Sequence, residues 1–231
     1  MSLLHSVSAR LVLAGTILLE SGVAAISQPP PQIVFSELMW MGSSASSADE
    51  WIELLNTSRE PVDLAGWTIT KMTEEGESVM ALLEGVVPAG ETFLIANYSP
   101  ENTRSRLAVT PDMVTTAVSL PNSKLQLKLY DGASDAGGGL VDVADDGRGS
   151  PLAGSKEKRA SMVRVAPDIA GFEKRAWATS TTASGWDPGG EELGTPGALS
   201  GQTQQGAEGP SGDETAIVSL SWSHIKKELR R

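Results

Sequence analysis

Two groups of carboxylate side chains have the types and the spacing that could support chemistry. The first is Glu37, Asp49, Glu50 and Glu53, and the second is Asp142, Asp145 and Asp146, with Asp131 and Asp135 nearby. Oxygen ligands suit calcium, so the second group, on glycine-rich loops, gives weak calcium candidates at Asp142, Asp145 and Asp146. No EF-hand is present, because the glutamate required at position twelve of such a loop is missing. No other cofactor is predicted.

The first group admits a structural interpretation beside calcium binding. Asp49 and Glu50 precede a β-rich run, where they are predicted to cap a loop by accepting backbone N–H bonds. Glu53 alternates with apolar neighbours and is predicted to pair with a lysine or arginine across a sheet. Paired carboxylates also hydrolyse glycosides. The sequence has no recognisable cleft motif, so that reaction would rest on composition alone.

The positions of histidine and the absence of cysteine narrow the possible enzymes. The only histidines are His5 and His224, one near each end of the chain, and there is no cysteine. Residues 28–213 therefore lack the side chain most used for proton transfer near neutral pH. Neither a Ser-His-Asp triad nor a zinc site with histidine or thiolate ligands can be built there. The sequence predicts a protein that is not an enzyme.

Charge and aromatic residues restrict the possible partners. Residues 28–213 contain 13 basic and 26 acidic side chains, a net charge of −13, which repels nucleic acid and anionic lipid. The run Lys156–Arg159 is predicted to be the only basic spot able to contact an anion. Trp186 and Asp187 lie in a predicted loop and are the best candidates for an exposed interaction surface. The alternative for Trp186 is packing over the end of a sheet.

Short β-rich runs separated by turns must position these side chains. Leu125, Leu127 and Leu129 alternate with polar residues, the clearest pattern of a half-buried strand. No segment between residues 33 and 198 has sustained helical periodicity. Seven or more short strands indicate an antiparallel β-sandwich. The predicted runs are 33–40, 50–56, 66–70, 79–83, 92–97, 125–130, 140–143 and 161–165.

The flanks of this body differ from it in composition. Residues 1–27 have a basic start, an apolar run and small residues before a cleavage point, which predicts a secretory signal peptide. A membrane anchor is disfavoured because Glu20 interrupts the apolar run short of the ~20 residues that a span needs. The predicted location is therefore secreted or cell surface. We expect a Pro-rich spacer at 28–32, the domain at 33–198, a disordered linker at 199–214, and a short tail or the stub of a further domain at 215–231.

Several short motifs, taken in order, resemble the lamin tail domain family, which has an immunoglobulin-like β-sandwich. The resemblance covers about residues 33–198 and includes Leu120–Ser123, Val141-Asp142 and Ser161–Arg164. It implies an all-β fold and a structural role for the motif residues. These are Glu37, Asp49, Glu50, Trp51, Glu53, Leu54, Asn56, Gly66, Trp67, Gly194, Thr195, Pro196 and Gly197.

The resemblance implies a non-catalytic binding or structural module that displays loops from a rigid sandwich. Its expected partner is a protein or a polymer of the envelope or the extracellular space. One alternative is an accessory targeting domain of a larger secreted enzyme, a nuclease or another hydrolase, continuing beyond Arg231. Another is a weak DNA- or calcium-binding module. No coiled-coil heptads precede the domain, so filament assembly is not implied.

Overall fold

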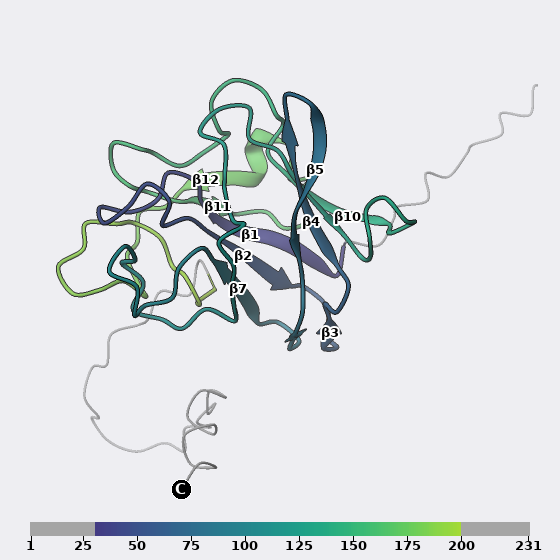
Figure 1. The fold of residues 1–231 in the computed structure, drawn as a ribbon, viewed down its shortest axis with the longest axis horizontal. Helices are drawn as coiled ribbons and strands as arrows, with labels where there is room; N and C mark the ends of the chain where they lie inside the picture. The colour runs from purple at the N-terminus through teal and green to yellow at the C-terminus, as the bar shows by residue number, and fades with distance from the viewer. Residues whose placement is uncertain (1–30, 200–231) are drawn as a thin grey trace, which may run out of the picture.

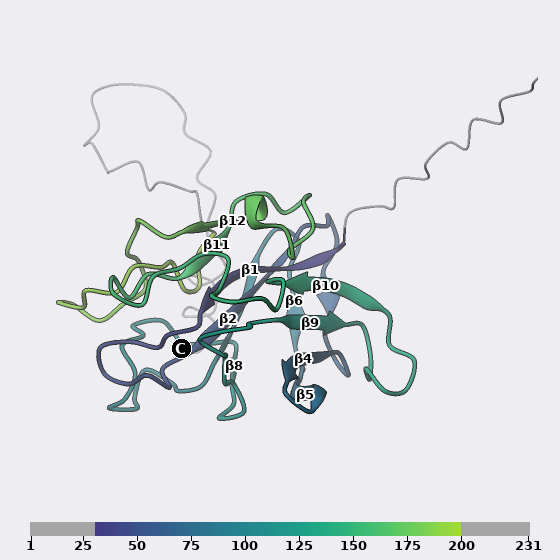
Figure 2. The same ribbon diagram turned by 90° about the horizontal axis from the view of Figure 1, so that it is seen from above.

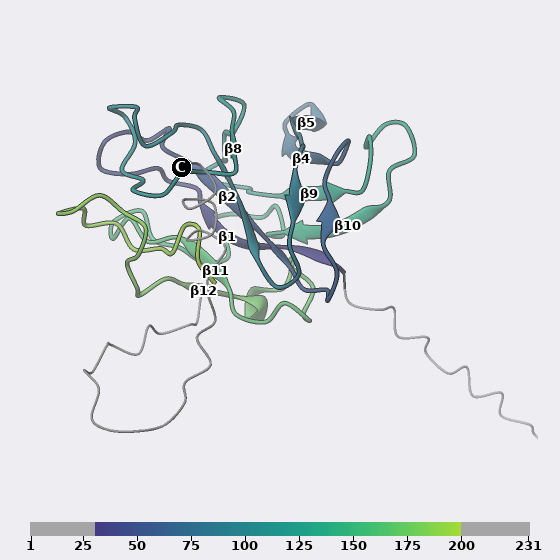
Figure 3. The same cartoon turned by 90° about the horizontal axis from the view of Figure 1, so that it is seen from below.

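Two sheets pack face to face in the computed structural model, which describes residues 31–199 (Figure 1). The larger sheet has the strand order β12-β11-β1-β2-β7-β8 and the smaller one the order β10-β9-β4-β5. Figures 2 and 3 show these two sets of strands as separate layers. All named strand pairs are antiparallel except β7 with β8. The predicted all-β, immunoglobulin-like antiparallel sandwich is confirmed.

Eight strands agree with the predicted runs to within a few residues, whereas the short strands β3, β6, β8 and β12 were not predicted. Between β4 and β5, Thr73 pairs with Gly76, so both strands extend beyond the predicted runs to a tight turn at Glu74 and Glu75. The larger sheet contains β1 (Ile33–Met39), β2 (Trp51–Asn56), β7 (Thr92–Ala96), β8 (Met113–Val114), β11 (Met162–Arg164) and β12 (Trp177–Thr179). The smaller contains β4 (Thr68–Thr73), β5 (Gly76–Leu82), β9 (Leu127–Tyr130) and β10 (Leu140–Ala144). β3 (Val62–Asp63) pairs with β6 (Val86–Val87), and the 3-10 turn η1 (Lys174–Ala176) precedes β12.

The central strands β1 and β2 are buried on both faces. Every residue of β1 is buried, and in β2 only Leu55 is partly exposed. Ile52 and Leu54 belong to the apolar core, which also contains Leu127 and Leu129 of the smaller sheet. The opposite face of β2 carries Trp51, whose ring centroid lies 6.0 Å from that of Trp186. A segment near the C-terminal end of the domain therefore covers the outer face of the larger sheet.

A β-bulge in β1 decides the direction of Glu37. Phe35 is opposite Leu54, but Glu37 is opposite Glu53, so Ser36 is the extra residue between them. Residues directly opposite each other in an antiparallel pair share a face of the sheet. The bulge thereby places two glutamates side by side on the face that carries Trp51.

The predicted flanks lie largely outside the part of the chain that the structure describes. This holds for the signal peptide, for most of the spacer, for the linker beyond Leu199 and for the tail. Within residues 31–199 we find no helix with the length and apolar character needed to cross a bilayer.

Candidate functional site

Glu37 binds the segment that closes the domain, residues 186–197, hereafter the closing segment. Its Oε1 accepts hydrogen bonds from the Ser161 hydroxyl and, at 2.9 Å, from the Thr195 backbone N–H. Its Oε2 accepts one from the Thr195 hydroxyl at 2.6 Å. A Cβ atom on Gly194 would lie only 2.9 Å from Oε1. Glycine at this position thus permits the close approach of the closing segment to Glu37.

Glu53, the cross-strand neighbour of Glu37, holds the same segment. Its Oε2 accepts a hydrogen bond of 2.6 Å from the Gly197 N–H, and its Oε1 one of 3.3 Å from the Ser36 hydroxyl. The predicted pairing with lysine or arginine is wrong, because the cross-strand neighbours of Glu53 are Glu37 and Leu94. Burial and, secondly, the nearby Glu37 raise the pKa of Glu53 well above its usual range.

Asp49 and Glu50 hold loops in the way predicted for them. Asp49 Oδ2 accepts a hydrogen bond of 2.8 Å from the Arg106 N–H. Glu50 Oε2 accepts one of 2.9 Å from the Leu120 N–H. Burial raises the pKa of Glu50 to about 7 and also raises that of Asp49. These carboxylates are therefore used inside the domain, where they fix loops to the larger sheet.

The remaining motif residues also have internal roles. Asn56 is fully buried, and its Nδ2 donates to the carbonyls of Glu60 and Val87. Leu54 and Trp51 lie in the core, and Trp67 packs half-buried against it. Gly66 adopts a positive φ of 82°, a conformation that favours glycine.

The structure does not bring the calcium candidates together into one site. Asp142 Oδ2 accepts hydrogen bonds from the Phe35 N–H at 2.9 Å and from the buried Arg164 guanidinium at 3.2 Å. Asp145 accepts from the backbone N–H groups of Asp146 and Leu152, and Asp146 from that of Arg148. Among residues 31–199 no group of three or more acidic or histidine side chains is arranged to hold a metal ion.

Trp186 and Asp187 are each only partly exposed. Trp186 is half-buried, and its indole N–H donates to the Gly194 carbonyl at 3.0 Å. The Asp187 N–H donates to the Arg106 carbonyl at 2.8 Å. The alternative interpretation of Trp186, packing over the sheet, is the one that the structure supports.

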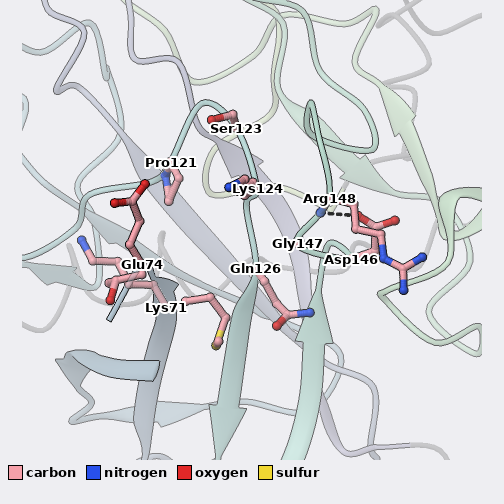
Figure 4. A pocket seen from close by; sticks show the side chains of 11 residues that line it. Lys71, Glu74, Pro121, Ser123, Lys124, Gln126, Asp146, Gly147 and Arg148 are labelled. Atoms are coloured by element: carbon pink, nitrogen blue, oxygen red, sulfur yellow. Dashed lines mark hydrogen bonds between the residues drawn. The ribbon is translucent and has the colours of Figure 1, made fainter. Parts of the chain in front are cut away.

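A pocket of about 610 Å³ lies where β4 meets two loops, and we call it the cationic pocket. In Figure 4, Lys71 and Glu74 lie on one side of it and Asp146 and Arg148 on the other, with the segment 121–126 between them. Three cations thus line one pocket of an acidic domain, and Lys156–Arg159 is not the only basic spot. Its lining residues are Lys71, Met72, Thr73, Glu74, Pro121, Ser123, Lys124, Gln126, Asp146, Gly147 and Arg148.

Comparison with known families decides the identity of the domain. The sequence model described as Lamin Tail Domain matches residues 26–147. The chain belongs to the lamin tail domain family. The resemblance predicted from its motifs is confirmed. No curated protein matches the chain.

The structure of this lamin tail domain continues beyond the family match. β11 lies directly beside β1 in the larger sheet, and β12 follows β11. Glu37 and Glu53 receive their hydrogen bonds from residues 161–197 as well as from Ser36. The C-terminal third of the described residues therefore completes the sandwich.

Replacing Asp142 by asparagine is expected to lower the free energy of unfolding by about 3–5 kcal/mol. The amide oxygen can still accept the Phe35 N–H, but the buried Arg164 loses its anionic partner. Denaturant unfolding of the variant measures the change. An Asp168→Asn variant is a suitable control, because no salt bridge involves Asp168 among residues 31–199. A variant as stable as the original would show that this ion pair contributes nothing.

The raised pKa of Glu50 predicts a pH dependence of stability. The folded domain retains a proton that the unfolded chain releases above the ordinary value of 4.5. The free energy of unfolding therefore falls as the pH rises from 4.5 to about 7, by at most ~1.4 kcal/mol per pH unit from this group. Glu50→Gln is expected to remove this contribution to the slope, as measured by urea unfolding across the range. An unchanged slope would contradict the raised pKa.

The backbone of Lys124 is strained, which predicts a stabilising substitution. Its φ is 53°, in the left-handed region, and its N–H donates to the Gly149 carbonyl at 2.7 Å. A non-glycine residue there costs about 1–2 kcal/mol, partly offset by the greater entropy of glycine in the unfolded chain. Lys124→Gly should raise the free energy of unfolding by about 0.5–1 kcal/mol. Lys156→Gly, at a residue without positive φ, should not raise it, and thermal unfolding of both variants tests the difference.

Proposed function

We propose that this lamin tail domain is a non-catalytic binding module of a secreted or cell-surface protein, whose partner is a polymer of the envelope or the extracellular space. The observation that carries the proposal is the cationic pocket, an open hollow in a domain of net negative charge. Its volume of about 610 Å³ lies within the ~300–1,000 Å³ of ligand sites.

Lack of catalysis is supported by how the carboxylates are used. The buried acids Glu37, Glu53 and Asp49 accept hydrogen bonds from the domain's own backbone or hydroxyl groups. Their oxygens hold loops in place, which a residue transferring protons to a substrate would have to give up. The export of the chain rests on the leader-like residues 1–27, which lie outside the described residues.

Co-sedimentation with insoluble envelope polymers tests the proposal. The chain from residue 28 to Arg231 is expected to sediment with the polymer and to release no soluble product. Calcium at millimolar concentration should leave the bound fraction unchanged. Release of soluble fragments would identify an enzyme, and a protein that stays in the supernatant with every polymer fraction would contradict a binding role.

A further inference from the structure

We propose that the cationic pocket binds an acidic polysaccharide, with its cations on sugar carboxylates and its polar groups on hydroxyls. This inference rests on the proposed function and names the class of polymer. Three chain segments supply the cations: Lys71 from β4, Lys124 from the loop before β9, and Arg148 from the loop after β10. None of them takes part in a salt bridge among residues 31–199, although the Lys71 ammonium donates to the Ser119 carbonyl at 3.2 Å. Lys124 and Arg148 therefore offer their charge to a ligand, and Lys71 adds to the positive potential at the edge of the pocket.

The loops that carry two of these cations are held in defined conformations. Lys124 has the positive φ described above, and its N–H is bonded to Gly149 of the opposite loop. Asp145, next to the pocket, has a φ of 68° and fixes its own loop through the Asp146 and Leu152 N–H groups. Strained residues that the surroundings hold in place are often found at ligand sites. The cations are thus presented by ordered loops, which lowers the entropy cost of binding.

A second hollow of about 350 Å³ extends the pocket and shares Gln126, Asp146 and Arg148 with it. It is also lined by Phe172, which is 53 % exposed. An exposed phenyl ring offers an apolar face to the C–H side of a sugar ring. The neighbouring Lys128 is paired with Glu77 and adds no free charge. Cations at one end and an aromatic ring at the other suit a chain of several sugars better than a small anion.

The acids in the pocket select against other anionic polymers. Three cations, Lys71, Lys124 and Arg148, and two acids, Glu74 and Asp146, leave a net charge of 3 − 2 = +1. The phosphates of nucleic acid accept hydrogen bonds but cannot donate any to these two acids. Sugar hydroxyls can donate hydrogen bonds to the same carboxylates. An acidic peptide has charged side chains that cannot donate to them.

Titration with tetragalacturonate, a uronic acid oligosaccharide, tests the inference on the chain 28–231. We expect saturable binding that weakens with added salt, and none to the neutral maltotetraose. The double variant K124E/R148E should weaken binding about tenfold or more, because it removes two attractive charges and adds two repulsive ones. The matched control K156E/K158E changes the total charge equally on a loop outside the pocket, and it should retain the affinity.

A second variant separates binding from folding. Lys124→Gly is expected to raise the melting temperature and still to weaken tetragalacturonate binding, and Phe172→Ala should weaken it without loss of fold. Equal weakening by both double variants would overturn the pocket as the site. Binding of polyglutamate or a single-stranded oligonucleotide in preference to tetragalacturonate would overturn the ligand class. Sedimentation with envelope polymer but no binding of the uronate would refute this inference alone, and failure of both assays would refute the proposed function too.

Discussion

A chain that ends at Gly147, where the family match ends, is expected not to fold cooperatively. It keeps the strands β1 to β10 but lacks β11 and β12, which form one edge of the larger sheet beside β1. It also lacks the buried side chains Met162 and Trp177, each worth about 1.5–3 kcal/mol of burial.

The same truncation leaves two buried acids without their partners. Asp142 loses Arg164, and a buried charge without its partner costs about 3–5 kcal/mol. Glu37 loses Ser161 and Thr195. The net free energy of unfolding of a domain is only ~5–15 kcal/mol, so these losses together are as large as the entire stability.

Circular dichroism and thermal scans of residues 28–147 and 28–200 provide the measurement. The longer fragment should unfold in one transition at the same temperature as 28–231, whereas the shorter should show none. A cooperative transition for residues 28–147 would mean that the first ten strands form a core by themselves and that the C-terminal part is an addition to it.

Much of the fold was predictable because its signals are local. The alternation of Leu125, Leu127 and Leu129 predicts one buried face, and all three are fully buried. The run Thr92–Asn97 is apolar on both faces, as expected for a strand in the middle of a sheet, and β7 lies between β2 and β8. Periodicity identifies such elements because it depends only on neighbours in the sequence.

The partners of the acidic residues were not predictable in the same way. Glu53 is bonded to Gly197, 144 residues along the chain. Its proximity to Glu37 depends on the bulge at Ser36, without which Glu37 would lie opposite Ile52. No pattern of residue types in the run 33–39 indicates a bulge. The motif therefore indicated which residues are structurally important. Their hydrogen-bond partners follow from the pairing register of the strands, which the sequence does not show.

The cationic pocket was missed for a related reason. Lys71, Lys124 and Arg148 are each single cations among polar and acidic residues, and they meet only through the pairing of β4 with β9 and of β9 with β10. Basic residues that are neighbours in the sequence indicated only Lys156–Arg159. The useful signal is the position of single cations in or next to strands that pair with one another.

Replacing Glu53 by glutamine is expected to stabilise the domain above neutral pH by roughly 1–3 kcal/mol. With the pKa of Glu53 raised by burial and by Glu37, the folded domain holds a proton that the unfolded chain releases above the ordinary 4.5. The free energy of unfolding therefore falls as the pH rises through the folded-state pKa. Glutamine stays neutral, its oxygen can accept the Gly197 N–H, and its amide can donate to the Ser36 hydroxyl. The variant should match the original near pH 4 and exceed it at pH 8.

Glu37→Ala is expected to have the opposite effect, a loss of about 3–5 kcal/mol at pH 7. It removes the acceptor of the Ser161 and Thr195 hydroxyls and of the Thr195 N–H, all inside the domain. Urea unfolding at several pH values distinguishes the two glutamates, with Glu50→Gln as a control at another carboxyl whose pKa is raised by burial. If Glu53→Gln destabilises the domain at pH 8 as much as Glu37→Ala does, the two acids do not repel each other. Both would then contribute equally to holding the closing segment. A gain for one and a loss for the other would show that the closing segment is held chiefly by Glu37, while a charge on Glu53 works against the fold.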